Sequence, residues 1–197
     1  MDARSYFLTL HQHSHGDIPG LGSWMLNLPT PEQMRVNLPG HNSIAWIIWH
    51  IARGEDWSVN TMLRGEEQLL TRDDWNRRLG LQRLDWGPGM TDDEMVELTE
   101  KIDLTALREY FDAVTADTRR FIASFDFDRL DDPLDVKSRL ALAPEALGPG
   151  SEMVQRIVEG QTTNRWFLNV MTLSDVYLHL GEVGHIFQMV APDRPRV

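Results

Sequence analysis

The chain has 197 residues, 42% of them hydrophobic, which is enough for one buried core and favours a single domain over residues 1–197. Its net charge of −11 argues against a general binder of the nucleic-acid backbone, because such a protein needs a basic surface. The absence of cysteine excludes disulfides and thiolate metal ligands, so a metal site would have to use histidine and carboxylate. No apolar run reaches the length of a membrane span and no secretion signal is recognisable, so we expect a cytoplasmic protein without a membrane partner.

Helical periodicity starts near the beginning of the chain. Residues 3–14 are expected to form a first helix with apolar side chains on one face, before a stretch rich in Gly and Pro. A second main helix is expected to begin after a cap at Asn42 or Ser43. It should run to about Leu63 and end near Gly65, because glycine is favoured just beyond a helix end.

Residues 66–104 are predicted to be a long connection that contains short helices. Thr71 is expected to cap one of them, and Thr91 is expected to cap another through a capping box. A third main helix should begin near residue 103 and run to about Phe125, because its apolar residues follow helical spacing.

The last third of the chain is expected to be irregular over residues 126–150. Ser151 should then open a short helix that ends near Gly160, and a fourth main helix should span roughly residues 163–190. No useful stretch alternates polar and apolar residues in the way a half-buried strand would. Four long apolar helices predict an all-α protein, an antiparallel four-helix bundle with a long helical insertion between its second and third helices.

The strongest clue to function is a polar stripe on the last helix. Asp175, His179 and Glu182 fall on one face at helical spacing, in a segment that is otherwise mostly apolar. His50 lies in the second main helix, which is apolar almost all round. Burying an acid and an imidazole together is costly without compensation, and a divalent metal would supply it. We therefore predict that His50, Asp175 and His179 are metal ligands that leave an open coordination position.

Glu182 lies one turn beyond His179, and its role has three interpretations. It is a fourth ligand, an acceptor that orients His179, or a catalytic base acting on metal-bound water. His185 lies at the edge of the stripe, and we expect an exposed histidine there and not a ligand. Asp175 also has a simpler interpretation, because Ser174 and Asp175 are typical of a local helix start.

Other polar residues near the second helix have ordinary explanations. His11, His13 and His15 alternate in the expected first helix, and at most two of them share a face. We expect them to be polar positions, with His11 or His15 the ones able to reach the mouth of the site. Glu55 and Asp56 are expected at a solvated helix end, where Asp56 either orients a ligand or pairs with Arg53.

The segment 42–56 resembles the second helix of the DinB-like superfamily. It contains the motif S-I-x-W-x-x-x-H-I, in which the family's histidine binds metal and here corresponds to His50. Residues 175–182 are similar to the family's last-helix motif H-x-x-x-H-x-G-Q, with Asp175 at the first histidine and Glu182 at the glutamine. A second register places His185 on this motif but leaves glycine at the upstream ligand, so the first register is preferred.

The resemblance implies a four-helix bundle, expected to be a homodimer, with a divalent metal at one end of its core. Related mycothiol-dependent isomerases use a carboxylate with two histidines, so Asp175 is compatible with a metal. Several relatives are, or are thought to be, thiol transferases that use bacillithiol or mycothiol. We therefore expect a small electrophilic substrate, a low-molecular-weight thiol cosubstrate, and Zn, Ni, Fe or Mn. The alternatives are a metal-dependent hydrolase and a metal-free stress-response or binding protein of the same fold.

Overall fold

The computed structural model describes residues 1–11 and 27–191, and within them all regular elements are helical. The only strand-like pairing in the described residues is an isolated bridge between Pro133 and Thr163. The all-α prediction is therefore confirmed. The elements are α1 (Ala3–Leu10), α3 (Pro31–Met34), α4 (Ile44–Asp56), η1 (Trp57–Arg64), α5 (Leu69–Arg72), α6 (Trp75–Leu79), α7 (Asp92–Lys101), α8 (Leu104–Ser124), η2 (Phe127–Arg129), α9 (Val136–Leu140), α10 (Glu152–Glu159), α11 (Asn164–Asn169), η3 (Val170–Ser174) and α12 (Asp175–Val190).

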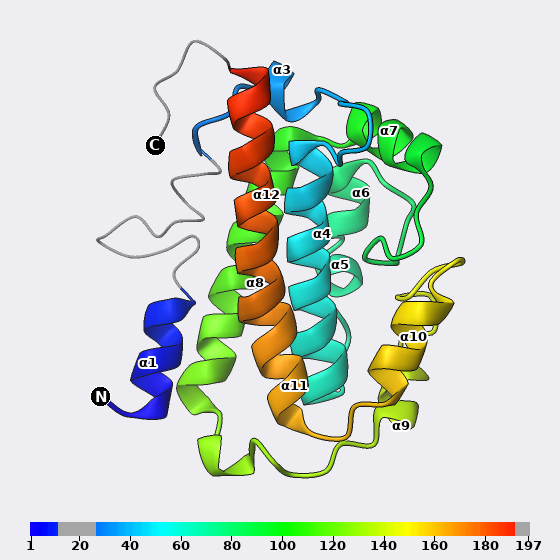
Figure 1. Cartoon of the computed structure of the whole chain (residues 1–197). Helices are drawn as coiled ribbons and strands as arrows, with labels where there is room; N and C mark the ends of the chain where they lie inside the picture. Colours follow the sequence, from blue (N-terminus) through cyan, green and yellow to red (C-terminus); the bar gives the residue numbers. More distant parts are fainter. Residues whose placement is uncertain (12–26, 192–197) are drawn as a thin grey trace.

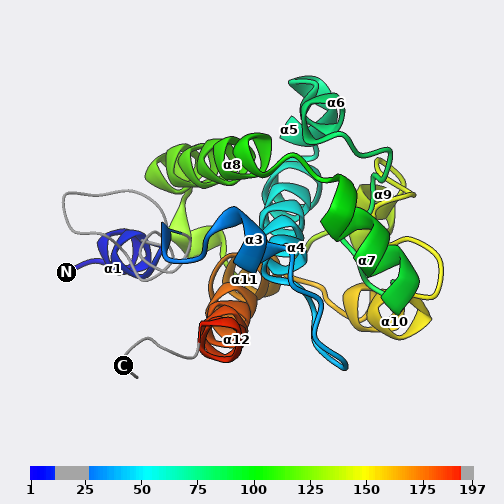
Figure 2. The same cartoon turned by 90° about the horizontal axis from the view of Figure 1, so that it is seen from above.

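Three long helical rods form the centre of the structure. They are α4 with η1, α8, and α11 continued through η3 into α12 (Figure 1). Seen from above, α4 lies between α8 and α12 and contacts both, which explains why its residues are buried all round (Figure 2). α4 and α8 run in the same direction, and α12 runs in the opposite one (Figure 1). α5, α6 and α7 lie in the connection that returns the chain from the end of η1 to the start of α8.

The ends of α4 and η1 follow local sequence signals. The Ser43 hydroxyl accepts a hydrogen bond from the Trp46 backbone N–H at 3.0 Å, so Ser43 is the N-cap. The rod ends at Gly65, whose φ of +74° lies in the left-handed region that glycine adopts without strain. The predicted limits of this helix are therefore confirmed, although its second half, η1, is π-helical.

The last rod also contains a π-helical segment, η3, directly before Asp175. Ser174 has helical backbone angles and its side chain makes no capping hydrogen bond. Asp175 therefore lies inside a continuous rod, and the interpretation of Ser174 and Asp175 as a helix start is wrong. π-helical turns inside α-helices are frequent at functional sites.

One of the two caps predicted in the connection is confirmed. Thr91 caps α7 in a capping box with Glu94, as expected. Thr71 does not cap a helix, because it lies within α5. The first turn of α5 is stabilised instead by Asp56, whose carboxylate accepts the backbone N–H groups of Leu69 and Leu70, both at 2.9 Å.

The prediction of a solvated helix end at Glu55 and Asp56 is wrong, because their exposed fractions are 1% and 0%. Asp56 accepts hydrogen bonds from the Tyr110 hydroxyl at 2.6 Å and from Asn60 at 2.8 Å. It also pairs with the buried Arg53 at 3.4 Å, which is one of the two roles predicted for Asp56. These donors satisfy the hydrogen-bonding capacity of a carboxylate that is buried away from water.

His11 contributes to the packing of α1. Its Nε2 lies 3.0 Å from a carboxylate oxygen of Glu55, and both side chains are buried. Phe7 stacks on the His11 ring, and Arg119 donates to the His11 carbonyl oxygen at 2.9 Å. His11 therefore links α1 to α4 and is not a member of the His50 site. His13 and His15 lie outside the described residues.

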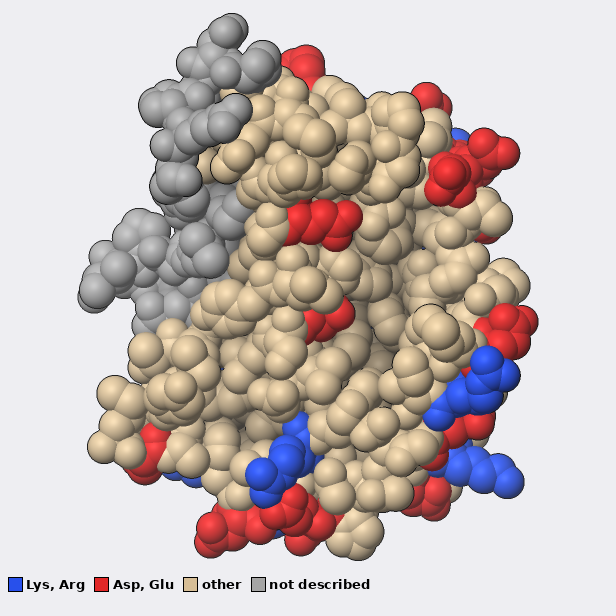
Figure 3. Space-filling view, viewed as in Figure 1, with Lys and Arg blue, Asp and Glu red and all other residues tan. Residues whose placement is uncertain are grey.

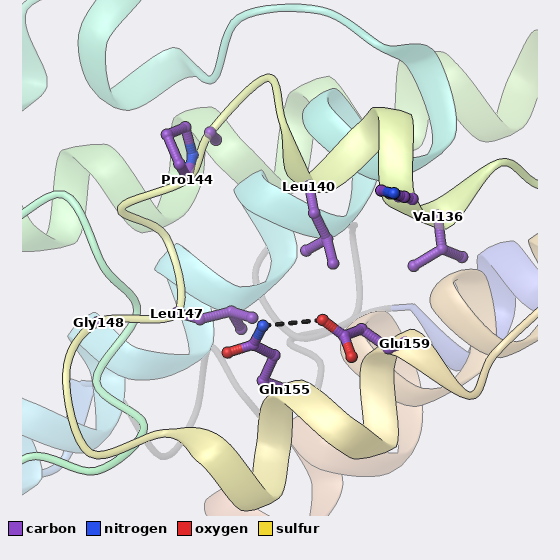
Figure 4. Close-up of a pocket in the computed structure, with 9 residues that line it drawn as sticks. Val136, Leu140, Pro144, Leu147, Gly148, Gln155 and Glu159 are labelled. Carbon is purple, nitrogen blue, oxygen red and sulfur yellow. Dashed lines mark hydrogen bonds between the residues drawn. The ribbon is translucent and has the colours of Figure 1, made fainter.

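The stretch 126–150, expected to be irregular, contains the short helices η2 and α9. A cavity of about 580 Å³ lies between α9, the segment 143–148 and α10 (Figure 4). Its walls are mixed, because Leu140 and Leu147 lie among polar side chains, and in the wall Gln155 donates a hydrogen bond to Glu159 at 2.8 Å. None of the predicted site residues lines this cavity. No helix among the described residues combines the length and apolar character needed to cross a bilayer.

Candidate metal centre

α4 and α12 bring together the three predicted metal ligands. His50, Asp175 and His179 each offer one ligand atom, and these atoms lie within 4.8 Å of one another. The Nε2 atom of His50 lies 3.8 Å from Asp175 Oδ2, and the Nε2 atom of His179 lies 3.6 Å from Asp175 Oδ1. The i, i+4 spacing places Asp175 and His179 on one face of α12, and the packing of α4 against α12 adds His50.

The imidazole of His50 is held on two sides. Its Nδ1 lies 2.6 Å from the carbonyl oxygen of Trp86, and Trp46 stacks on the ring with centroids 4.7 Å apart. Burial, and secondarily the charge of His179, lower the pKa of His50 from 6.5 to about 4. The imidazole is therefore neutral at pH 7, which is the form that binds a metal.

His179 is oriented by Glu182. Its Nδ1 lies 2.9 Å from Glu182 Oε2, while Nε2 faces Asp175. Burial alone lowers the pKa of His179, but the hydrogen bond to Glu182 and the charges of Asp175 and Glu182 outweigh burial and raise it above 6.5. His179 therefore gains a proton more readily than His50, and a metal would have to displace that proton.

The two carboxylates of the stripe differ in environment. Burial raises the pKa of Asp175, although the charge of His179 opposes this effect. The hydrogen bond with His179 lowers the pKa of Glu182, whose second oxygen accepts from Asn42 Nδ2 at 3.2 Å. Glu182 is thus engaged through both oxygens. Asp175 instead faces the two imidazoles, and no hydrogen bond from the described residues to its carboxylate offsets the effect of burial on its pKa.

The chemistry of these donors fits a divalent cation. Both histidines use Nδ1 in a hydrogen bond to an acceptor, which leaves their Nε2 lone pairs directed toward Asp175. Outer acceptors of this kind are typical of metal-binding histidines, because they fix the tautomer and the ring orientation. Two imidazoles and one carboxylate match the ligand sets of Zn, Ni, Fe and Mn sites.

The surface around these helices carries negative charge. Figure 3 shows acidic atoms in the middle of the face that displays α4 and α12, whereas most Lys and Arg atoms lie toward its lower and right-hand edges. A cavity of about 390 Å³ reaches Glu182 between the segment 37–42 and α7, and no Lys or Arg is among the described residues that line it. The surroundings of the site therefore favour cations over anions.

Comparison with known proteins identifies the family. The profile of the DinB superfamily matches residues 23–183, which is most of the sequence. The chain belongs to the DinB superfamily. No curated protein sequence matches it. A crystal structure described as the conserved protein of locus from Enterococcus faecalis is similar in fold, with a TM-score of 0.64 and 17% sequence identity over 96% of this chain and 95% of that chain.

The DinB superfamily match supports the assignment of family, and the geometry supports the preferred register of its last-helix motif. His185 is exposed, its ring centroid lies 6.0 Å from that of His41, and it is not part of the metal-capable group. Asp175 and His179, which lie ten and six residues before His185 and so closer to the π-helical segment, face His50 instead.

Two contributors to the site were not predicted. The carbonyl oxygen of Trp86 orients His50, and no residue type at position 86 would signal the use of a backbone atom. Asn42, considered only as a helix cap, donates to Glu182, while Ser43 provides the cap. The sequence signal for Asn42 was present, because a polar residue directly before the N-cap is free to turn toward a neighbouring helix.

Proposed function

We propose that this member of the DinB superfamily is a divalent-metal-dependent enzyme whose ligands are His50, Asp175 and His179. The observation that carries the proposal is the convergence of three ligand atoms within 4.8 Å from two packed helices. The occupied Nδ1 atoms of both histidines add support, because only Nε2 remains available to a cation. Three protein ligands would leave open positions for a substrate.

The reaction we propose is transfer of a small thiol to an electrophile. The chain has no cysteine, so the thiol would arrive as a low-molecular-weight cosubstrate of the bacillithiol or mycothiol type. When bound, the cation would lower the pKa of the thiol and so favour the nucleophilic thiolate at neutral pH. The family resemblance suggests this chemistry, and the metal-capable group makes it physically reasonable.

In this proposal the protein's own residues hold and shield the site. Glu182 would act mainly as the acceptor that orients His179, because both of its oxygens are already engaged. A role as a catalytic base requires one oxygen to exchange its partner for the substrate. Trp46 and Trp86 lie against His50 and restrict the access of water to that ligand.

We also propose that α1, α4 with η1, α8, and α11 to α12 correspond to the four helices of a DinB bundle. α1 packs on α8, and α4 packs on both α8 and α12. A homodimer and a cytoplasmic location belong to the same proposal. Sedimentation of the purified protein would test the dimer.

The first experiment is elemental analysis of the purified protein before and after chelation. We expect about one divalent ion per chain, and sharply lower metal content in His50→Ala and in His179→Ala. His185→Ala is the matched control, because it removes an exposed histidine from the same helix. Full occupancy in both ligand variants would show that the metal site is wrongly assigned.

A second experiment separates the classes of function. The metal-loaded protein is offered 1-chloro-2,4-dinitrobenzene with and without a small thiol, and 4-nitrophenyl acetate without thiol. A thiol transferase forms a conjugate only when metal and thiol are both present, and chelation lowers its rate. Thiol-independent ester hydrolysis that His50→Ala abolishes would identify a hydrolase, and the absence of both reactions would support a binding protein without catalysis.

A further inference from the structure

One backbone carbonyl decides which nitrogen of His50 faces the candidate metal site. The Trp86 carbonyl oxygen can only accept a hydrogen bond, so the Nδ1 atom 2.6 Å away must carry the proton of the neutral ring. The lone pair then lies on Nε2, which faces Asp175. If the carbonyl turned away, Nδ1 would lose its acceptor and the proton could move to Nε2, where it would block coordination.

The peptide that contains this carbonyl is fixed by Asp85. A carboxylate oxygen of Asp85 accepts the backbone N–H of Gly87 at 2.9 Å. That N–H and the Trp86 carbonyl belong to the same planar peptide unit and point in opposite directions. Holding the N–H therefore sets the direction of the carbonyl, and Asp85 acts on His50 through one rigid group.

Close packing makes this arrangement specific. Gly87 has a φ of +99°, and a Cβ atom there would lie 2.9 Å from the Trp46 ring, 3.0 Å from Trp49 and 3.4 Å from His50 Nδ1. Only glycine lets the backbone approach the imidazole this closely. The preceding peptide is also anchored, since the Trp86 N–H donates to the Ala146 carbonyl oxygen at 3.1 Å.

Asp85 itself is buried and held by two arginines. The buried Arg53 donates to the Asp85 carbonyl oxygen at 3.3 Å and to the Leu84 carbonyl oxygen at 2.6 Å, which ties this segment to α4 one turn beyond His50. Arg83 contacts the Asp85 carboxylate at 3.1 Å from the outer side. The carboxylate thus has a charged partner outside and a backbone N–H inside.

We propose that Asp85 is a positioning residue for His50: by accepting the Gly87 N–H, it directs the Trp86 carbonyl to Nδ1 and presents Nε2 to Asp175 and His179. The effect on metal binding rests on the proposed function. The effect on the tautomer of His50 does not, because it belongs to the metal-free protein.

The test compares Asp85→Ala with Asp85→Asn. Asparagine keeps a side-chain oxygen that accepts from Gly87 but removes the charge that pairs with Arg83, whereas alanine removes both. Arg83→Ala is the matched control, because it removes the outer ion pair and leaves the acceptor. The ¹⁵N resonances of His50 in chelated, metal-free protein report its tautomer, and titration with Zn²⁺ or Co²⁺ reports the dissociation constant.

We expect wild type, Asp85→Asn and Arg83→Ala to keep the proton on Nδ1. Asp85→Ala should populate the Nε2–H tautomer and bind the metal about 10-fold more weakly, the lower end of the effect of losing an outer acceptor. If Asp85→Ala does not fold, Asp85→Glu replaces it, because the longer side chain keeps the charge but moves the acceptor. Melting curves of each variant establish that the fold is intact.

Two results would overturn the proposal. One is an unchanged His50 tautomer in the variant that lacks the acceptor. The other is an equal change in Asp85→Asn, which would show that the charge and not the acceptor matters. If the wild type binds neither metal ion, the proposed function fails, and the tautomer comparison in metal-free protein still decides the role of Asp85.

Discussion

The buried His50 makes the metal-free protein sensitive to acid. Burial lowers its pKa from 6.5 to about 4, and the charge of His179 adds to the effect. The unfolded chain takes up this proton near pH 6.5, but the folded protein takes it up only near pH 4. The contribution of His50 to stability is therefore complete above pH 6.5 and is lost as the pH falls through this window. At about 1.4 kcal/mol per pKa unit, the full loss is about 3 kcal/mol.

The measurement is urea unfolding of wild type and His50→Gln, both with chelator, from about pH 7.5 to about pH 4.5. Glutamine is polar but does not titrate, so carboxylates that titrate in both proteins cancel in the difference. The stability advantage of wild type over the variant should shrink by about 2.5 kcal/mol across this range. His179 acts in the opposite direction, because its pKa is raised: its stabilisation is present below pH 6.5 and is lost at higher pH. Both wild type and His50→Gln contain His179, so its contribution is present on both sides of the comparison.

A constant difference between the two proteins over this range would refute the reasoning. It would mean that the folded protein admits a proton at His50 as easily as the unfolded chain does. His185→Gln serves as the control, because it removes a histidine that is exposed and lies outside the metal-capable group. The difference between wild type and this control should not follow the trend seen with His50→Gln.

Three substitutions test the surroundings of the site and of the core. Glu182→Gln should keep the fold but weaken metal binding about 10-fold, because His179 loses a charged acceptor; unchanged affinity in a metal titration would leave Glu182 without an orienting role. Asp56→Ala should lower the free energy of unfolding by about 3–5 kcal/mol in urea, because it strands the buried Arg53; a loss below about 1 kcal/mol would contradict this. Gly87→Ala should cost about 1–3 kcal/mol through backbone strain and displace the His50 ring, and an unshifted His50 resonance would show that the contact relaxes freely.

The limits of the main helices could be predicted because their signals are local. Ser43 caps α4, Thr91 caps α7 and Gly65 ends η1, each within a few residues of the chain. The cap predicted at Thr71 was wrong because a remote group, Asp56, satisfies the first turn of α5. A capping signal in the sequence predicts only what nearby residues can do, and a buried carboxylate from another helix overrides it.

The same distinction explains the error at Glu55 and Asp56. Two acids near a helix end are usually solvated, and no pattern reveals that the partners lie elsewhere in the chain. Tyr110 reaches Asp56 from α8, and His11 reaches Glu55 from the end of α1. The burial of these acids depends on tertiary packing, because the groups that form hydrogen bonds with the buried carboxylates are distant in sequence.

The candidate metal ligands were predictable because two of them obey helical geometry. Asp175 and His179 must share a face of α12 at i, i+4 spacing, and a histidine on a helix as apolar as α4 needs a polar partner. What the sequence does not contain is the direction in which His50 faces. That direction depends on a peptide carbonyl at Trp86, held in place by Asp85 across a glycine. A set of metal ligands can thus be inferred from the side chains in the sequence. Which nitrogen of His50 is available to a cation depends on backbone groups, and these are the same for every residue type except proline.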